Sequence, residues 1–145
     1  MAGSIINMKE KIVEHRVYYY DTDKMGVVYH SNYLKWMEVA RTEFFRDILP
    51  YSTLEEMGVM LPVKTLNIEY FNSVKYDELI KIKIRLLEFS KIKIKFLYEI
   101  YDESFTQLKA KAETVNVFTD ADGNLKRLSG EVRNLFGNYI SVLSK

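Results

Sequence analysis

Apolar side chains recur along this chain with two different periods, one typical of a helix and the other of strands. In residues 32–48 they return every three or four positions, which predicts a long helix with a broad apolar face. Ser31 or Asn32 is suited to cap the start of this helix, and Pro50 ends it. The apolar positions are Tyr33, Trp36, Met37, Ala40, Phe44, Phe45 and Ile48.

Strict alternation predicts strands in the second half of the chain. In residues 77–89 and 91–101, apolar residues alternate with lysines, and the two segments are close enough to form a hairpin. Residues 11–20, 61–71 and 107–119 are the other predicted strands, the first because it is rich in β-branched and aromatic residues.

The segments between these elements contain turn residues. Gly26 allows a turn after the first strand, residues 51–60 form a short connection with a helical turn, and the sequence DADGN at 120–124 ends the last strand. Ser129 is suited to cap a final helix. The apolar positions of that helix are Val132, Leu135, Phe136, Tyr139 and Ile140.

The order of these elements indicates an α+β fold. Four strands gathered after one strand and a long helix favour an antiparallel sheet of about five strands, wrapped around that helix. The lysine-rich face of the sheet then meets water. The 145 residues are enough for one sizeable core, so residues 1–145 are interpreted as a single domain.

Composition removes several classes of function. The 21 Lys and Arg residues nearly balance 20 Asp and Glu, which argues against a general binder of nucleic acid or membrane surfaces. The absence of Cys excludes thiol chemistry, and only 2 His argue against a His-rich metal centre. No apolar run approaches the ~20 residues of a membrane span, and the first residues lack a signal-peptide core. We therefore expect a cytoplasmic protein that does not insert into membranes.

The densest group of chemistry-bearing residues lies in residues 18–46. Asp21 and Asp23 are followed by the turn at Gly26, by His30 and by the helix start. The unpaired N–H groups and positive dipole end of a helix stabilise a developing oxyanion, and a carboxylate on the preceding loop can act as nucleophile or general base. From spacing alone, however, the favoured interpretation is that both acids are turn and cap residues.

Three segments change that balance: Asp21-Thr22-Asp23, residues 26–33 (GVVYHSNY) and residues 38–43 (EVARTE). The residues of these segments and their order resemble the signature of the hot-dog acyl-CoA thioesterases, most closely the 4-hydroxybenzoyl-CoA thioesterase-like group and its YbgC-type branch. The resemblance implies a hot-dog fold, hydrolysis of an acyl-CoA to a carboxylic acid and CoA, and no cofactor or metal. It also implies a homodimer, or a tetramer of two dimers, with active sites at the dimer interface.

The resemblance implies roles for individual residues as well. Asp23 matches the catalytic aspartate, Tyr19 an active-site tyrosine four positions earlier, and His30 the position whose backbone N–H polarises the thioester carbonyl. Attack by Asp23 on the carbonyl and activation of water by Asp23 both stay open, as does the role of the His30 ring. Asp21 is interpreted as orienting the loop, and His15 as a structural residue of the first strand.

Substrate contacts are expected along the long helix, the second strand and two basic segments. The candidate acyl-binding residues that also suit the core are Tyr33, Trp36, Leu61 and Val63, with Met60 beside them. By the resemblance, Glu38 matches a helix position that carries an acid near the acyl group. By the resemblance, the CoA-binding candidates are Ser90, Lys91, Lys126 and Arg127. For most basic residues of the hairpin the favoured alternative is a solvated sheet face. The sequence sets neither the acyl group nor the choice between CoA and acyl-carrier protein.

Three other functions compete with hydrolysis. A non-catalytic protein that binds acyl-CoA or acyl-carrier protein has the same fold, but an intact Asp23 argues against it. A hot-dog dehydratase or hydratase is disfavoured because its His-Phe-Pro type of segment is absent. Nucleic-acid binding rests only on the lysine-rich hairpin, and the balanced charge disfavours it.

Overall fold

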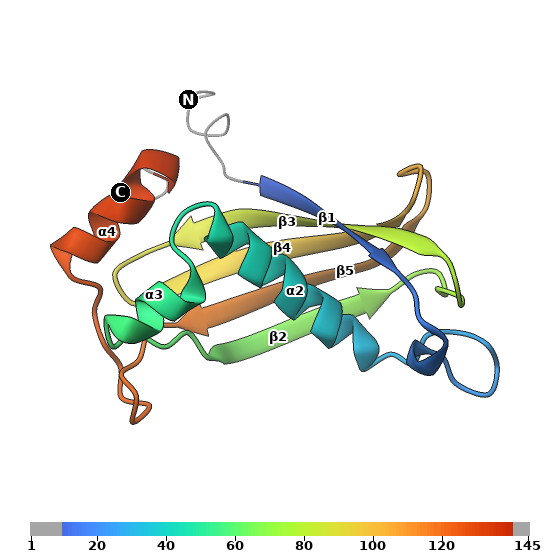
Figure 1. The fold of residues 1–145 in the computed structure, drawn as a ribbon, viewed down its shortest axis with the longest axis horizontal. Helices are drawn as coiled ribbons and strands as arrows, with labels where there is room; N and C mark the ends of the chain where they lie inside the picture. Colours follow the sequence, from blue (N-terminus) through green and yellow to red (C-terminus); the bar gives the residue numbers. More distant parts are fainter. Residues whose placement is uncertain (1–9, 141–145) are drawn as a thin grey trace.

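The computed structural model describes residues 10–140, apart from the side chains at positions 51, 135 and 137–140. Its centre is an antiparallel sheet of five strands in the order β1-β3-β4-β5-β2. The helix α2 (Asn32–Arg46) lies across one face of this sheet (Figure 1). The predicted α+β fold is therefore confirmed. The strands are β1 (Glu10–Arg16), β2 (Val63–Tyr70), β3 (Leu79–Phe89), β4 (Lys93–Asp102) and β5 (Leu108–Val117).

Alternation along β3 and β4 determines which face of the sheet is buried. The register sets Ile82 opposite Ile100 and Ile84 opposite Tyr98, so the apolar stripes of the two strands fall on the same face. That face meets the buried residues of α2, and each large side chain that is fully buried contributes about 1.5–3 kcal/mol to stability. On the other face Lys95 pairs with Glu113 at 3.3 Å and stays partly exposed, as predicted for the lysine stripe.

The helix α2 begins where the sequence predicts, but its predicted cap is wrong. Ser31 has helical backbone angles and makes no capping bond with its side chain. The side-chain amide of Asn32 instead donates to the carbonyl of Asp21 at 2.8 Å. This bond fastens the first turn of the helix to the loop that precedes it.

The first strand ends earlier than the predicted residue 20. β1 stops at Arg16, and a short 3-10 turn, η1 (Tyr19–Asp21), follows. The turn forms because the carboxylate of Asp21 accepts a hydrogen bond from the N–H of Tyr18 at 3.0 Å. It takes the aromatic residues off the sheet and leaves Tyr19 77% exposed.

Two short helices complete the described part of the chain. The helix α3 (Tyr51–Glu56) occupies the predicted connection, and α4 (Gly130–Ile140) follows Ser129, whose hydroxyl accepts the N–H of Val132 at 3.3 Å as expected of a cap. Phe136 of α4 packs against Phe45 with ring centroids 5.8 Å apart. Leu135, Tyr139 and Ile140, which were predicted on the same apolar face, have side chains outside the described residues. Among residues 10–140, no helix is long and apolar enough to cross a membrane.

The loop that joins β4 to β5 fixes the ionisation of one partly exposed acid, Asp102. The Thr106 hydroxyl donates to the Asp102 carboxylate at 2.6 Å, and the N–H groups of Thr106 and Gln107 donate at 2.8 and 3.0 Å. These bonds, with the Thr106 hydroxyl foremost, lower the pKa of Asp102 to about 2. Because the folded pKa lies below the unfolded one, the bonds stabilise the fold above about pH 4 and are lost as the pH falls towards 2.

We expect Asp102→Asn to lower the melting temperature near neutral pH, and the difference from the wild type to shrink between about pH 4 and pH 2. Thermal unfolding followed by circular dichroism measures both effects. Glu103→Gln, at the exposed neighbouring position, is the matched control and is expected to change little. A difference that stays constant across this pH range would contradict the assignment.

Candidate active site

The two acids of the Asp-Thr-Asp segment lie in different surroundings. Asp21 is only 4% exposed, whereas Asp23 is exposed at the start of a tight turn. In that turn the Asp23 carbonyl accepts the N–H of Gly26 at 3.1 Å, and Gly26 has a φ of +79°, which glycine adopts without strain. The side chain of Asp23 also accepts the N–H of Met25 through Oδ1 at 2.8 Å. One carboxylate oxygen thus stabilises the turn, and Oδ2 has no hydrogen-bond donor among the described residues.

Asp21 holds both ends of this loop. Its carboxylate caps the preceding turn, and its carbonyl accepts the N–H of Tyr29 at 3.0 Å and the side-chain amide of Asn32 at 2.8 Å. Between these points, Val28 donates its N–H to Val74 at 2.7 Å. The loop that presents Asp23 is therefore fastened to η1, to the start of α2 and to the segment before β3.

His30 lies two residues before α2, at the positive end of the helix dipole. Its carbonyl accepts the Tyr70 hydroxyl at 3.0 Å and the N–H of Tyr33 at 3.3 Å. Its own backbone N–H has no acceptor among residues 10–140. The imidazole packs against the ring of Tyr29, with centroids 4.6 Å apart. An unpaired N–H at the start of a helix is the donor that an oxyanion site requires.

A cavity of about 310 Å³, here called the helix-start cavity, opens beside His30. Burial, with smaller contributions from the nearby Tyr70 and Glu78, raises the pKa of Tyr33 to about 12. The Tyr33 hydroxyl therefore stays neutral and able to donate a hydrogen bond throughout the physiological pH range. The residues that line the cavity are Val28, His30, Tyr33, Tyr70, Phe71, Asn72 and Ser73.

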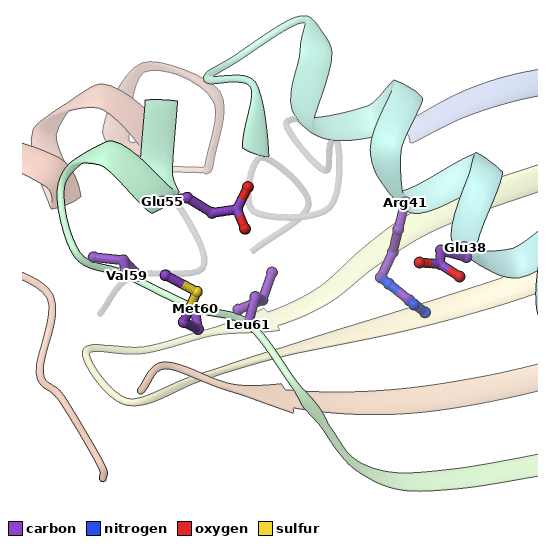
Figure 2. A pocket seen from close by; sticks show the side chains of 6 residues that line it. All are labelled: Glu38, Arg41, Glu55, Val59, Met60 and Leu61. Atoms are coloured by element: carbon purple, nitrogen blue, oxygen red, sulfur yellow. The ribbon is translucent and has the colours of Figure 1, made fainter. Parts of the chain in front are cut away.

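A second cavity, of about 200 Å³, lies farther along α2 and is called the mid-helix cavity (Figure 2). Side chains reach it from α2, from α3 and from the segment that leads into β2. Arg41 is hydrogen-bonded to the sheet below, because its Nη1 donates to the Tyr98 hydroxyl at 2.9 Å. That hydroxyl lies 2.7 Å from Thr114 Oγ1. The residues that line the cavity are Glu38, Arg41, Glu55, Val59, Met60 and Leu61.

The two cavities lie along α2 and meet opposite ends of β2. The helix-start cavity includes Tyr33 and Tyr70, the last residue of β2, whereas the mid-helix cavity includes Arg41 and Leu61, just before β2 begins. Eight residues of helix separate Tyr33 from Arg41, which corresponds to about 12 Å along the axis.

The structure distributes the predicted acyl-binding residues among three environments. Tyr33 lines the helix-start cavity, and Glu38 and Leu61 line the mid-helix cavity. Trp36 is only 3% exposed, and its ring packs in the core against the ring of Tyr33, with centroids 4.9 Å apart. Val63 is exposed as the first residue of β2. Tyr19, predicted to be catalytic, contacts the ring of Tyr76 at 5.6 Å on the outside of the loop.

Three of the four predicted CoA-binding residues lie at the hairpin between β3 and β4. The N–H of Leu128 donates to the carbonyl of Lys91 at 2.9 Å, which brings the backbone of Arg127 beside the turn. Lys126 extends instead towards the segment between α3 and β2, where its Nζ donates to the carbonyl of Gly58 at 3.2 Å. Ser90 closes the hairpin turn by accepting the N–H of Lys93 at 3.2 Å. This is the end of the sheet opposite to the Asp23 loop (Figure 1). The 11 residues of β3 that separate the two ends correspond to about 36 Å.

Sequence reasoning missed Arg41 and Tyr70 as site residues. Arg41 did leave a signal, because a charged residue sits among the apolar positions Met37, Ala40 and Phe44 of one helix face. Tyr70 left none, since an aromatic residue at the end of a strand is common.

Known proteins resemble this chain over most of its length. Residues 17–136 match the thioesterase-like superfamily. The chain is 36% identical over 118 residues to YneP of Bacillus subtilis (strain 168), covering 81% of this chain and 83% of YneP. It is 32% identical over 106 residues to the acyl-CoA thioester hydrolase YbgC of Escherichia coli O6:H1, covering 72% of this chain and 78% of that protein. The solved structure of a DHNA-CoA thioesterase from Staphylococcus aureus superposes with a TM-score of 0.84 at 30% identity, over 92% of each chain.

The bond between Arg41 and Tyr98 generates a stability prediction. Tyr98→Phe removes the partner of both Arg41 and Thr114, and we expect the free energy of unfolding to fall by about 1–2 kcal/mol. The measurement is equilibrium urea denaturation. Tyr101→Phe, on the same strand, is the control, because the Tyr101 hydroxyl has no hydrogen bond among the described residues and its removal should change stability by less than about 0.5 kcal/mol. Equal effects of the two substitutions would argue against the network.

Proposed function

The chain belongs to the thioesterase-like superfamily, and on that premise we propose that it hydrolyses acyl-CoA thioesters with Asp23 as the catalytic carboxylate. One observation carries the proposal. A single short loop presents the exposed carboxylate of Asp23 and, seven residues later, the unpaired N–H of His30 at the helix start. These are the two groups that acyl transfer from a thioester needs.

The chemistry follows from these two groups. The His30 N–H donates to the thioester oxygen and stabilises the negative charge that develops there, an effect typically worth about 10²–10³ in rate. Asp23 either attacks the carbonyl carbon or removes a proton from the attacking water. The C–S bond then breaks, water supplies the hydroxyl of the acid, and the thiol takes up a proton. A thiol with a pKa of about 8.5 is a good leaving group, so no strong acid is required to assist it.

The cavities along α2 offer space for the acyl group. The helix-start cavity lies beside the proposed oxyanion donor and includes the neutral hydroxyl of Tyr33. The mid-helix cavity, with Glu38 and Leu61 in its wall, is a separate space farther along the helix. A cavity of about 150 Å³ is enough to hold a benzene ring, so the helix-start cavity, at about 310 Å³, has room for an acyl group of that size.

A complete site requires two copies of the chain in this proposal. The basic residues Lys91, Lys126 and Arg127 suit the phosphates of CoA, but the length of β3 separates them from Asp23. If both ends act on one CoA thioester, the hairpin end of one copy lies near the Asp23 loop of another. Exposed aromatic residues at the loop, Tyr19 and Tyr20 among them, suit such a contact.

One observation favours the second candidate function, a non-catalytic acyl-CoA-binding or acyl-carrier-protein-binding module. Asp23 Oδ1 is already engaged with the N–H of Met25, so the side chain has a structural role whether or not it is catalytic. The two functions differ in turnover.

A panel of acyl-CoA thioesters of varied length and aromaticity, with thiol release followed by a dye, tests hydrolysis directly. We expect turnover of at least one member, and a loss of about 10²-fold or more in kcat for Asp23→Asn, which keeps the turn acceptor but removes the charge. Asp122→Asn, in the exposed turn after β5, is the control and should remain fully active. Tight binding of an acyl-CoA without turnover would instead favour the binding module.

Mixing two inactive variants tests whether two chains share a site. Asp23→Asn carries the lesion at one end of the sheet, and the double substitution Lys91→Glu/Arg127→Glu carries it at the other. Unfolding and refolding an equal mixture should restore about a quarter of the wild-type activity, because about half of the dimers are mixed and each of those has one intact site. No recovery, in a mixture shown to contain mixed dimers, would mean that each chain acts alone.

A further inference from the structure

The imidazole of His15 has no role in the site proposed above, yet it points at the residue that holds the loop. Its Nε2 atom is buried without a hydrogen-bond partner among the described residues. The nearest acid is Asp21, whose Oδ2 lies 3.7 Å from that nitrogen. We propose that His15 is a positioning residue, which holds Asp21 and through it the loop from Asp23 to His30. This inference rests on the proposed hydrolysis for its kinetic consequence.

Packing fixes the direction of the His15 ring. His15 lies on β1 opposite Ile80, on the strand face that also holds Val13 against the core. Its ring centroid lies 5.4 Å from that of Trp36 on α2 and 5.5 Å from that of Tyr18. Because the rings of Trp36 and Tyr18 both contact the His15 ring, Nε2 of His15 has little freedom to turn elsewhere.

Asp21 has room for one more donor. A carboxylate that is only 4% exposed needs hydrogen bonds to compensate for its lost hydration, and Asp21 has one, from the N–H of Tyr18. The 3.7 Å gap to His15 is too long for a formed hydrogen bond. Bonds that support catalysis are often long in the absence of substrate and shorten in the complex. In our proposal, Nε2–H of His15 donates to Oδ2 of Asp21 once the thioester is bound.

The bonds of Asp21 transmit its position to both reacting groups. Its carbonyl accepts the N–H of Tyr29, next to His30, and the side chain of Asn32 at the helix start. Thr22, which follows Asp21, bridges to Val28 and begins the turn that carries Asp23. A shift of Asp21 therefore displaces the carboxylate and the oxyanion donor relative to each other. A misplacement of about 1 Å at a reacting centre can cost about 10²-fold in rate.

Two substitutions of His15 separate positioning from packing. His15→Phe keeps the aromatic contacts with Trp36 and Tyr18 but removes the donor, whereas His15→Gln keeps a donor. We expect His15→Phe to lower kcat by about 10- to 100-fold with KM changed less than about threefold. His15→Gln should recover a large part of that loss. Combined with Asp21→Asn, His15→Phe should cause little further loss, because the two residues act through one contact.

Amide hydrogen exchange of residues 22–30 gives a readout that does not depend on turnover. We expect faster exchange there in His15→Phe, slower exchange again in His15→Gln, and no change in β4. If the wild type cleaves no acyl-CoA, the proposed function fails, but this exchange pattern would still support positioning by His15. Wild-type kcat together with unchanged exchange in His15→Phe would overturn the proposal. So would a loss of kcat that His15→Gln does not restore, since that result would assign His15 to packing alone.

Discussion

The burial of one broad helix face against one sheet is the constraint on which the rest of the structure depends. Phe44 and Phe45 of α2 both contact Phe96 of β4, with ring centroids 5.1 and 5.8 Å apart. A helix held this deeply by aromatic packing has a fixed axis and a fixed start. The loop before it is consequently anchored at both ends, which is why a carboxylate and a helix-start N–H can be kept in a constant relation on an otherwise exposed segment.

The sequence predicted the sheet well because successive side chains of a strand point to opposite faces. When one face is buried, apolar residues therefore recur at every second position. Ile80, Ile82, Ile84 and Leu86 alternate along β3 and are the fully buried residues of that strand. The failures come from side chains that hydrogen-bond to the backbone. Propensity favoured a strand to residue 20, but the Asp21 carboxylate closed a turn at Tyr18. Asn32 was expected to cap its own helix, but its side-chain amide donates a hydrogen bond to the carbonyl of Asp21 instead.

The candidate site could be predicted only in part. The signature around Asp23 and His30 identified residue types and their order, and the structure adds the local bonds that those residues make. Glu38, Met60 and Leu61 of the mid-helix cavity were among the predicted residues, but the bond from Arg41 to Tyr98 was not predicted. These two residues are separated by 57 positions, and only the packing of helix on sheet brings them together. The nearness of Lys91 to Arg127 has the same origin, since a backbone bond from Leu128 joins segments far apart in the sequence.

The anchoring of Arg41 to the sheet has a consequence for how this protein can diversify. The guanidinium in the mid-helix cavity is joined to a buried tyrosine, so altering it disturbs the core as well as the cavity. Met60 and Leu61 line the same space from the irregular segment between α3 and β2, where they are partly exposed and substitutions meet fewer constraints than at the buried Val59. A change in the shape of this cavity is therefore more easily made from the connecting segment than from Arg41.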